Sequence, residues 1–161
     1  MTTNLDLARR VAKHVEIQVV TLRSSSVKTN FDVLNIPGSL GLRQGYRAAC
    51  DDSRFRSEGI LTILVGFVFH ASDAPEDEDT EPSDSDALVV EAEYGITYSI
   101  DRDVDLDAKC LEHFAKVNGP YNAWPYWREL VQSISGRVGL TSITVPVFRP
   151  PEHPVDDADC Q

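Results

Sequence analysis

Residues 118–149, NGPYNAWPYWRELVQSISGRVGLTSITVPVFR, carry the sequence features that decide the fold. Asn122 can cap the first turn of a helix, and Pro125 lies so early in that helix that its missing amide does little harm. Apolar residues then recur at helical spacing on one face: Trp127, Leu130, Val131, Ile134 and Val138. Gly139 supplies a left-handed stop. Beyond it, residues 143–147 alternate as a half-buried edge strand does.

Three segments before this stretch have the apolar patterns of β-strands. Residues 15–22 are rich in β-branched side chains, residues 59–71 are apolar on both faces, and residues 88–100 alternate between apolar and polar. The last two are predicted to form an antiparallel hairpin. Residues 35–44 are predicted to be an irregular but apolar connection, and residues 105–117 a short helix.

The order of these elements predicts the fold class. There is no alternation of strand, helix and strand, so we expect an α+β fold in which helices pack on one face of an antiparallel sheet. The length of 161 residues fits one domain, which we place at residues 1–149. A disordered acidic loop is expected at residues 72–87 and a flexible acidic tail at residues 150–161.

The negative charge lies mainly in those two segments. Of the net charge of −11, residues 72–87 supply eight acidic side chains without a Lys or Arg, and the tail supplies four more. Such acidity disfavours nucleic acid as a partner. Because the sequence has no apolar run of membrane-helix length and no signal-peptide pattern, we expect a cytoplasmic protein without membrane insertion.

No arrangement of residues predicts an enzyme, a metal site or a cofactor. Cys50, Cys110 and Cys160 are far apart and are expected to be reduced thiols. Residues 101–107 imitate a calcium loop, but Leu106 stands where the sharp turn needs Gly. Cys110 could pair with His113 as a nucleophile, yet it belongs to an apolar helix stripe, which favours core packing.

The sequence also resembles the SecB family of export chaperones. The resemblance is carried by Pro120, by the helix start AWPYWREL at residues 123–130, by Gly136-Arg137 and by VPVF at residues 145–148. It extends to VEIQ at residues 15–18, to residues 59–71, and to residues 90–100 with their Tyr-Ser-Ile ending. Together these segments span the chain from Val15 to Phe148.

The resemblance implies a sheet of four antiparallel strands, a long helix packed on it, and a tetramer made from two dimers. It also implies an ATP-independent chaperone that holds unfolded client polypeptides. A homodimer or homotetramer is therefore expected. The clients are either preproteins for export or one dedicated client, such as the antitoxin of a toxin–antitoxin system; a non-chaperone interaction subunit with the same fold is a further alternative.

A protein that holds unfolded chains needs exposed apolar grooves. The candidate client-binding residues are apolar side chains of the loop and of the doubly apolar strand: Leu34, Ile36, Leu40, Leu42, Phe67 and Phe69. The alternative is that these residues form only the core and the oligomer interface, and the sequence supports it about as well as it supports a client groove.

Two departures from the SecB pattern bear on partners and groove. Glu91 matches an acidic residue that docks the translocase motor SecA, but Ser24 and Lys28 stand where the family has the other acids. SecB also continues into a second C-terminal helix, which the prolines after Arg149 exclude here. The groove is therefore expected to be more open or closed differently.

Overall fold

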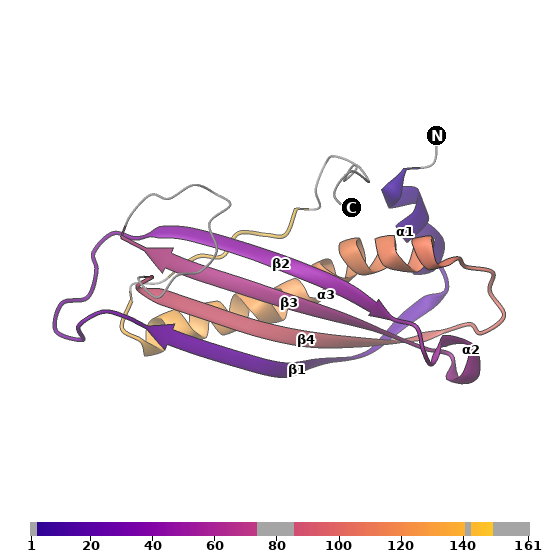
Figure 1. Cartoon of the computed structure of the whole chain (residues 1–161), viewed down its shortest axis with the longest axis horizontal. Helices are drawn as coiled ribbons and strands as arrows, with labels where there is room; N and C mark the ends of the chain where they lie inside the picture. Colours follow the sequence, from indigo (N-terminus) through magenta and orange to yellow (C-terminus); the bar gives the residue numbers. More distant parts are fainter. Residues whose placement is uncertain (1–2, 74–85, 141–142, 150–161) are drawn as a thin grey trace, which may run out of the picture.

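A single four-stranded antiparallel sheet forms one layer of the molecule. The computed structural model describes residues 3–73, 86–140 and 143–149. Its strands are β1 (Val15–Thr29), β2 (Gly41–Asp51), β3 (Ile60–Ser72) and β4 (Leu88–Ile100), in the spatial order β1-β4-β3-β2 (Figure 1). The predicted α+β fold class is confirmed, and so is the antiparallel pairing of β3 with β4. The residues between them, where the acidic loop was predicted, lie largely outside the described residues.

Helices cover one face of this sheet. The long helix α3 (Ala108–Arg137) packs on β2, β3 and β4, and α1 (Asn4–Ala12) packs on α3; α2 (Phe55–Glu58) is a single turn before β3 (Figure 1). Asp107 caps α3 by accepting a hydrogen bond from the Cys110 amide at 2.7 Å. Gly139 follows the helix at φ 82°, which confirms the predicted left-handed stop.

The prediction of two separate helices, at 105–117 and from Asn122, was wrong. They are one helix of 30 residues that contains Pro120 and Pro125. Each proline removes one helical hydrogen bond. The helix continues because Pro120 and its neighbours are buried against the sheet, so packing of this face outweighs the lost bonds.

The predicted strand at residues 143–147 was also wrong, and the fourth strand lies elsewhere. Residues 143–149 belong to no strand, whereas β2 forms within and beyond the segment predicted as an irregular connection. Pro146 cannot donate to a ladder. As an edge strand with many exposed residues, β2 lacks the continuous apolar pattern that identifies a central strand.

β1 is almost twice as long as its apolar pattern predicted. It pairs with β4 from Val15↔Ile100 to Thr29↔Leu88, and two irregularities in register occur along the way. The serines of residues 24–26 carry no strand signal of their own. They are extended because β4 provides a template for their backbone hydrogen bonds.

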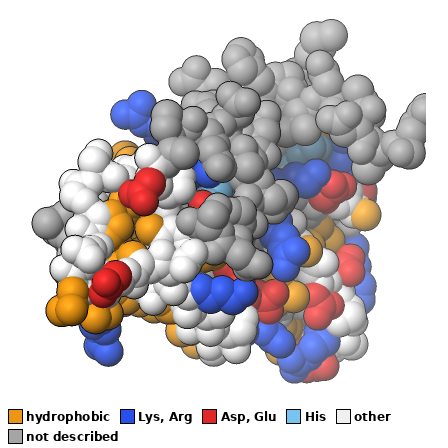
Figure 2. Space-filling model, turned by 60° about the vertical axis from the view of Figure 1, so that its left-hand side comes forward, with side chains coloured by type: hydrophobic (Ala, Val, Ile, Leu, Met, Phe, Trp, Pro, Cys, Tyr) orange, Lys and Arg blue, Asp and Glu red, His pale blue; other side chains and the backbone are white. Residues whose placement is uncertain are grey.

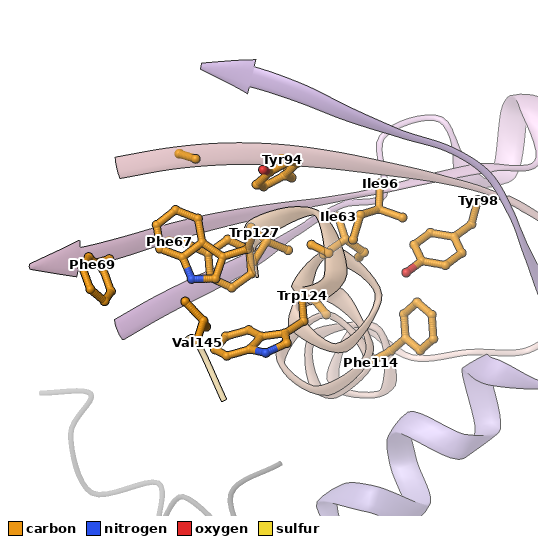
Figure 3. Close-up of a cluster of buried hydrophobic side chains, with 14 of the residues drawn as sticks. Ile63, Phe67, Phe69, Tyr94, Ile96, Tyr98, Phe114, Trp124, Trp127 and Val145 are labelled. Carbon is orange, nitrogen blue, oxygen red and sulfur yellow. The ribbon is translucent and has the colours of Figure 1, made fainter. Parts of the chain in front are cut away.

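The core lies between the sheet and α3. Phe67 stacks on Trp127 with ring centroids 5.1 Å apart and planes 11° from parallel, and Trp124 meets Phe67 edge-on at 5.6 Å (Figure 3). Gly119 lets the helix approach β3 closely, because a Cβ there would lie 2.6 Å from Ile63 Cγ2. This packing fixes where the helix leaves apolar surface uncovered.

Candidate functional site

The loop between β1 and β2 presents apolar side chains to solvent. Asp32 organises a tight turn, since its carboxylate accepts hydrogen bonds from the Leu34 amide at 2.9 Å and from the Asn35 side chain at 3.3 Å. Val33 and Leu34 are 80% and 87% exposed as a result. This end of the molecule faces forward in Figure 2, where apolar side chains lie open on the surface.

The other predicted loop residues are less open. Ile36 is 45% exposed, and its Cδ1 lies 3.3 Å from where a Cβ on Gly139 would be, so it rests against the end of α3. Leu40 is partly buried against the core. Leu42 is 46% exposed on the helix side of β2. The structure therefore brings Leu34, Ile36 and Leu42 to the surface at one end of the sheet.

Phe67 and Phe69 lie in the core of the chain, each 3% exposed. Both side chains lie on the helix side of β3, where Phe67 packs against the indoles of Trp124 and Trp127 and Phe69 lies farther along the strand (Figure 3). In the structure they are core residues between the sheet and α3. They do not line an open surface together with the loop residues.

An aromatic rim beside α3 was missed by the sequence reasoning. The Phe148 ring contacts Trp124 at 5.2 Å, Tyr46 of β2 at 5.5 Å and Tyr121 at 6.5 Å, measured between ring centroids. Tyr46 and Tyr121 remain 38% and 61% exposed. The spacing of Tyr121 and Trp124, one helical turn apart, was the available signal.

β1 presents a second exposed apolar surface. Ile17, Leu22 and Val27 occupy its helix side and are between 43% and 48% exposed, because α3 packs over the other three strands. β1 is also an edge strand, so its outer backbone groups have no partner strand within the described sheet. The register irregularities hide this apolar stripe from a simple period of two.

The opposite face of the sheet is mixed, with charged and hydroxyl side chains beside half-buried apolar ones such as Leu64 and Val68. It contains a hollow of about 650 Å³ lined by backbone and side chains of all four strands, with Glu91 and Glu93 on β4. Arg23 Nε lies 3.5 Å from Glu93, Ser26 Oγ donates to Glu91 at 3.1 Å, and both Arg47 and Arg23 lie across glycines of the sheet. Glu91, the predicted motor-docking residue, is thus exposed within a surface of mixed charge.

The geometry of the described residues gives no support to a metal site or to Cys110 as a nucleophile. Among residues 3–73, 86–140 and 143–149, no group of three or more His, Cys, Asp or Glu side chains is placed to hold a metal ion. Cys110 is buried, and burial followed by its contact with Asp107 raises the pKa of the thiol, which disfavours the nucleophilic thiolate. Within the same ranges, no helix combines the length and apolar character needed to cross a bilayer.

Comparison with known proteins gives similarity in structure but not in sequence. No protein-family model matches, and no curated protein matches. The SecB-like chaperone Rv1957 of Mycobacterium tuberculosis, solved with a ChAD peptide from the antitoxin HigA1 (Rv1956), superposes with a TM-score of 0.71 at 16% identity, covering 90% of this chain and 98% of that chain. A Streptococcus agalactiae protein of unknown function gives a TM-score of 0.43 at 8% identity, covering 82% and 96%. The chain therefore has the SecB-like fold.

Proposed function

We propose that this protein is an ATP-independent chaperone of the cytoplasm that holds non-native polypeptides. The observation that carries the proposal is the exposed apolar surface made by the loop, β2 and the aromatic rim: Val33, Leu34, Ile36, Leu42, Tyr46 and Tyr121. A soluble monomer rarely exposes so many large apolar side chains on connected elements unless they meet a partner. A SecB-like fold in a chaperone with a bound peptide supports the same function.

A dedicated client is the second candidate. It is favoured by the antitoxin peptide in the structure of Rv1957, and by the replacement of two expected acids by Ser24 and Lys28. In this form of the proposal, the client is one extended apolar segment of a specific antitoxin. In the general form of the proposal, the clients are a set of different preproteins. Binding of one antitoxin at concentrations where unrelated unfolded chains do not bind would decide for the dedicated role.

The exposed loop supplies the direct test of the holdase function. We expect the Leu34→Asp protein to need a roughly tenfold higher concentration than wild type for the same suppression of aggregation of a denatured model protein. The reason is that a leucine side chain contributes about 1.5 kcal/mol or more when a client buries it. At 87% exposure, the side chain can be changed with little effect on folding. Light scattering against chaperone concentration measures the effect.

Leu5→Asp is the matched control, since Leu5 is 43% exposed on α1, away from the loop. It should leave suppression unchanged. If wild-type protein that is folded fails to suppress aggregation at near-stoichiometric ratios, the chain is an interaction subunit rather than a holdase.

We propose β1 as the site of self-association into a homodimer, from which a homotetramer can form. An open edge strand with an apolar stripe on one side favours pairing with a second copy. Leu22→Asp is expected to shift the mass in solution to that of the monomer, because two unpaired carboxylates would be buried at the interface. Light scattering after size exclusion measures this mass, and Val33→Asp is the control. An unchanged mass for Leu22→Asp would place the interface elsewhere.

For a role in export, we propose Glu91 as a residue that docks the SecA motor. Its exposed carboxylate supports this, while the neighbouring Arg23 and Arg47 reduce the negative potential of the surface. Glu91→Lys should weaken any binding of purified SecA, seen as a faster dissociation in surface-based measurements. Equal binding of both forms would remove Glu91 from the interface.

A further inference from the structure

The C-terminal segment, residues 143–149, lies along α3 in the opposite direction (Figure 1). Pro146 contacts Trp124, and the later Phe148 contacts both Trp124 and the earlier helix residue Tyr121. Phe148 also meets Tyr46 on the edge strand β2. The segment therefore lies between the aromatic side of α3 and the helix side of β2, a space that we call the groove.

The way in which this segment is held resembles the binding of a ligand more than the pairing of a strand. Ile143 and Val145 are 7% and 4% exposed, while Val147 between Val145 and Phe148 is 61% exposed. Figure 3 shows the Val145 side chain directed toward the cluster of Phe67 and the two indoles. Ile143 and Val145, two positions apart, thus enter the groove as alternate side chains of an extended peptide do, and Phe148 enters it three positions after Val145.

The backbone of the segment is held by little else. Within the described part of the chain, its one hydrogen bond is from Trp124 Nε1 to the Pro146 carbonyl at 2.7 Å. Trp127, one helical turn further, is fully buried, and its Nε1 has no hydrogen-bond partner among the described residues. α3 therefore carries a second indole donor, and the segment makes no hydrogen bond to it.

We propose that the C-terminal segment is an intramolecular occupant of a peptide groove and that a client displaces it. The client segment fitting this groove is extended, with apolar side chains at alternate positions and an aromatic residue three positions after the last buried aliphatic one, as Phe148 follows Val145. A separate polypeptide could make the same contacts as this segment, because none of them depends on a covalent link to α3. A polypeptide that also supplies a carbonyl to Trp127 makes a contact that the segment does not.

This inference rests on the proposed holdase function and adds a closed state to it. A connected segment competes at an effective concentration in the millimolar range. The apparent affinity for a client is then reduced by the small fraction of molecules whose groove is open. A substitution that weakens the contacts of the segment with the groove should raise the affinity for an added peptide. A substitution that removes a groove side chain needed by clients should lower this affinity. The sign of the effect separates the two roles.

The test uses the full chain and a fluorescent peptide with the sequence of residues 140–149, LTSITVPVFR. We expect Phe148→Ala protein to bind this peptide at least about fivefold more tightly than wild-type protein, because the peptide phenylalanine can take the vacated place. Val147→Ala is the matched control: it changes the same segment at an exposed position and should bind like wild type. The peptide with Ala in place of its phenylalanine should lose the gain.

Unchanged or weaker binding by Phe148→Ala overturns the proposal. Circular dichroism and the unfolding midpoint establish that the variant is folded, and Phe148→Leu replaces it if the midpoint falls. Aggregation suppression on the same samples separates the two ideas. Tighter peptide binding without suppression supports the groove and removes the holdase function; suppression with equal peptide affinities keeps the holdase and removes the displacement.

Discussion

Phe67→Ala is expected to lower the free energy of unfolding by about 3–5 kcal/mol, the usual cost of removing a buried aromatic ring. Phe67 is 3% exposed and contacts four aromatic rings from β2, β4 and α3: Tyr46, Tyr94, Trp124 and Trp127. Its removal leaves a cavity between the sheet and the helix. A domain of this size is stable by about 5–15 kcal/mol, so the loss is a large part of the total.

Urea unfolding followed by tryptophan fluorescence, at one fixed protein concentration, measures this loss. Val68→Ala is the matched control, since Val68 is the next residue of β3, points to the other face and is half-buried; it should cost about 1 kcal/mol. A folded Phe67→Ala protein with nearly wild-type stability but weak client binding would support the prediction that Phe67 binds clients.

Gly119→Ala is expected to destabilise the protein by about 1–3 kcal/mol, although alanine normally stabilises a helix relative to glycine. The new Cβ would lie 2.6 Å from Ile63 Cγ2 and 3.1 Å from Val65 Cγ2 on β3. Both neighbours are fully buried and cannot move aside without disturbing the sheet. Overpacking therefore outweighs the gain in helix propensity.

Gly136→Ala, in the last turn of the same helix, provides the opposite sign. A Cβ at Gly136 would meet nothing within 4 Å, and the residue is exposed. This change should stabilise the protein by up to about 1 kcal/mol. The same urea titration compares both variants. Stabilisation by Gly119→Ala would mean that α3 lies farther from β3 than the structure shows.

Part of the candidate surface was predictable from the sequence. Leu34 and Leu42 belong to apolar stretches interrupted by glycine and proline, which is typical of apolar residues outside a central strand, and both are exposed. Phe67 and Phe69 have the same apolar character within a strand. The sequence could not show which of its two apolar faces α3 covers, because that depends on the helix position.

The aromatic rim was predictable only in its helical part, Tyr121 and Trp124, since its other members are far away in the sequence. Tyr46, Tyr121 and Phe148 come from an edge strand, a helix and a segment without regular structure. Only the return of the chain beside α3 brings them together. The apolar stripe of β1 was missed for a related reason, because register irregularities interrupt its alternation.

The sequence by itself determined the α+β class, the central hairpin of β3 and β4, the helix face through Trp127 and Val131, and the stop at Gly139. These features follow from local periodicity and from single residues with restricted backbone conformations. Tertiary structure alone decided that α3 continues through Pro120, that β2 rather than residues 143–147 completes the sheet, and that Phe67 is buried while Leu34 is open. Each of these depends on contacts between distant segments, whose burial outweighs the local preferences of the chain.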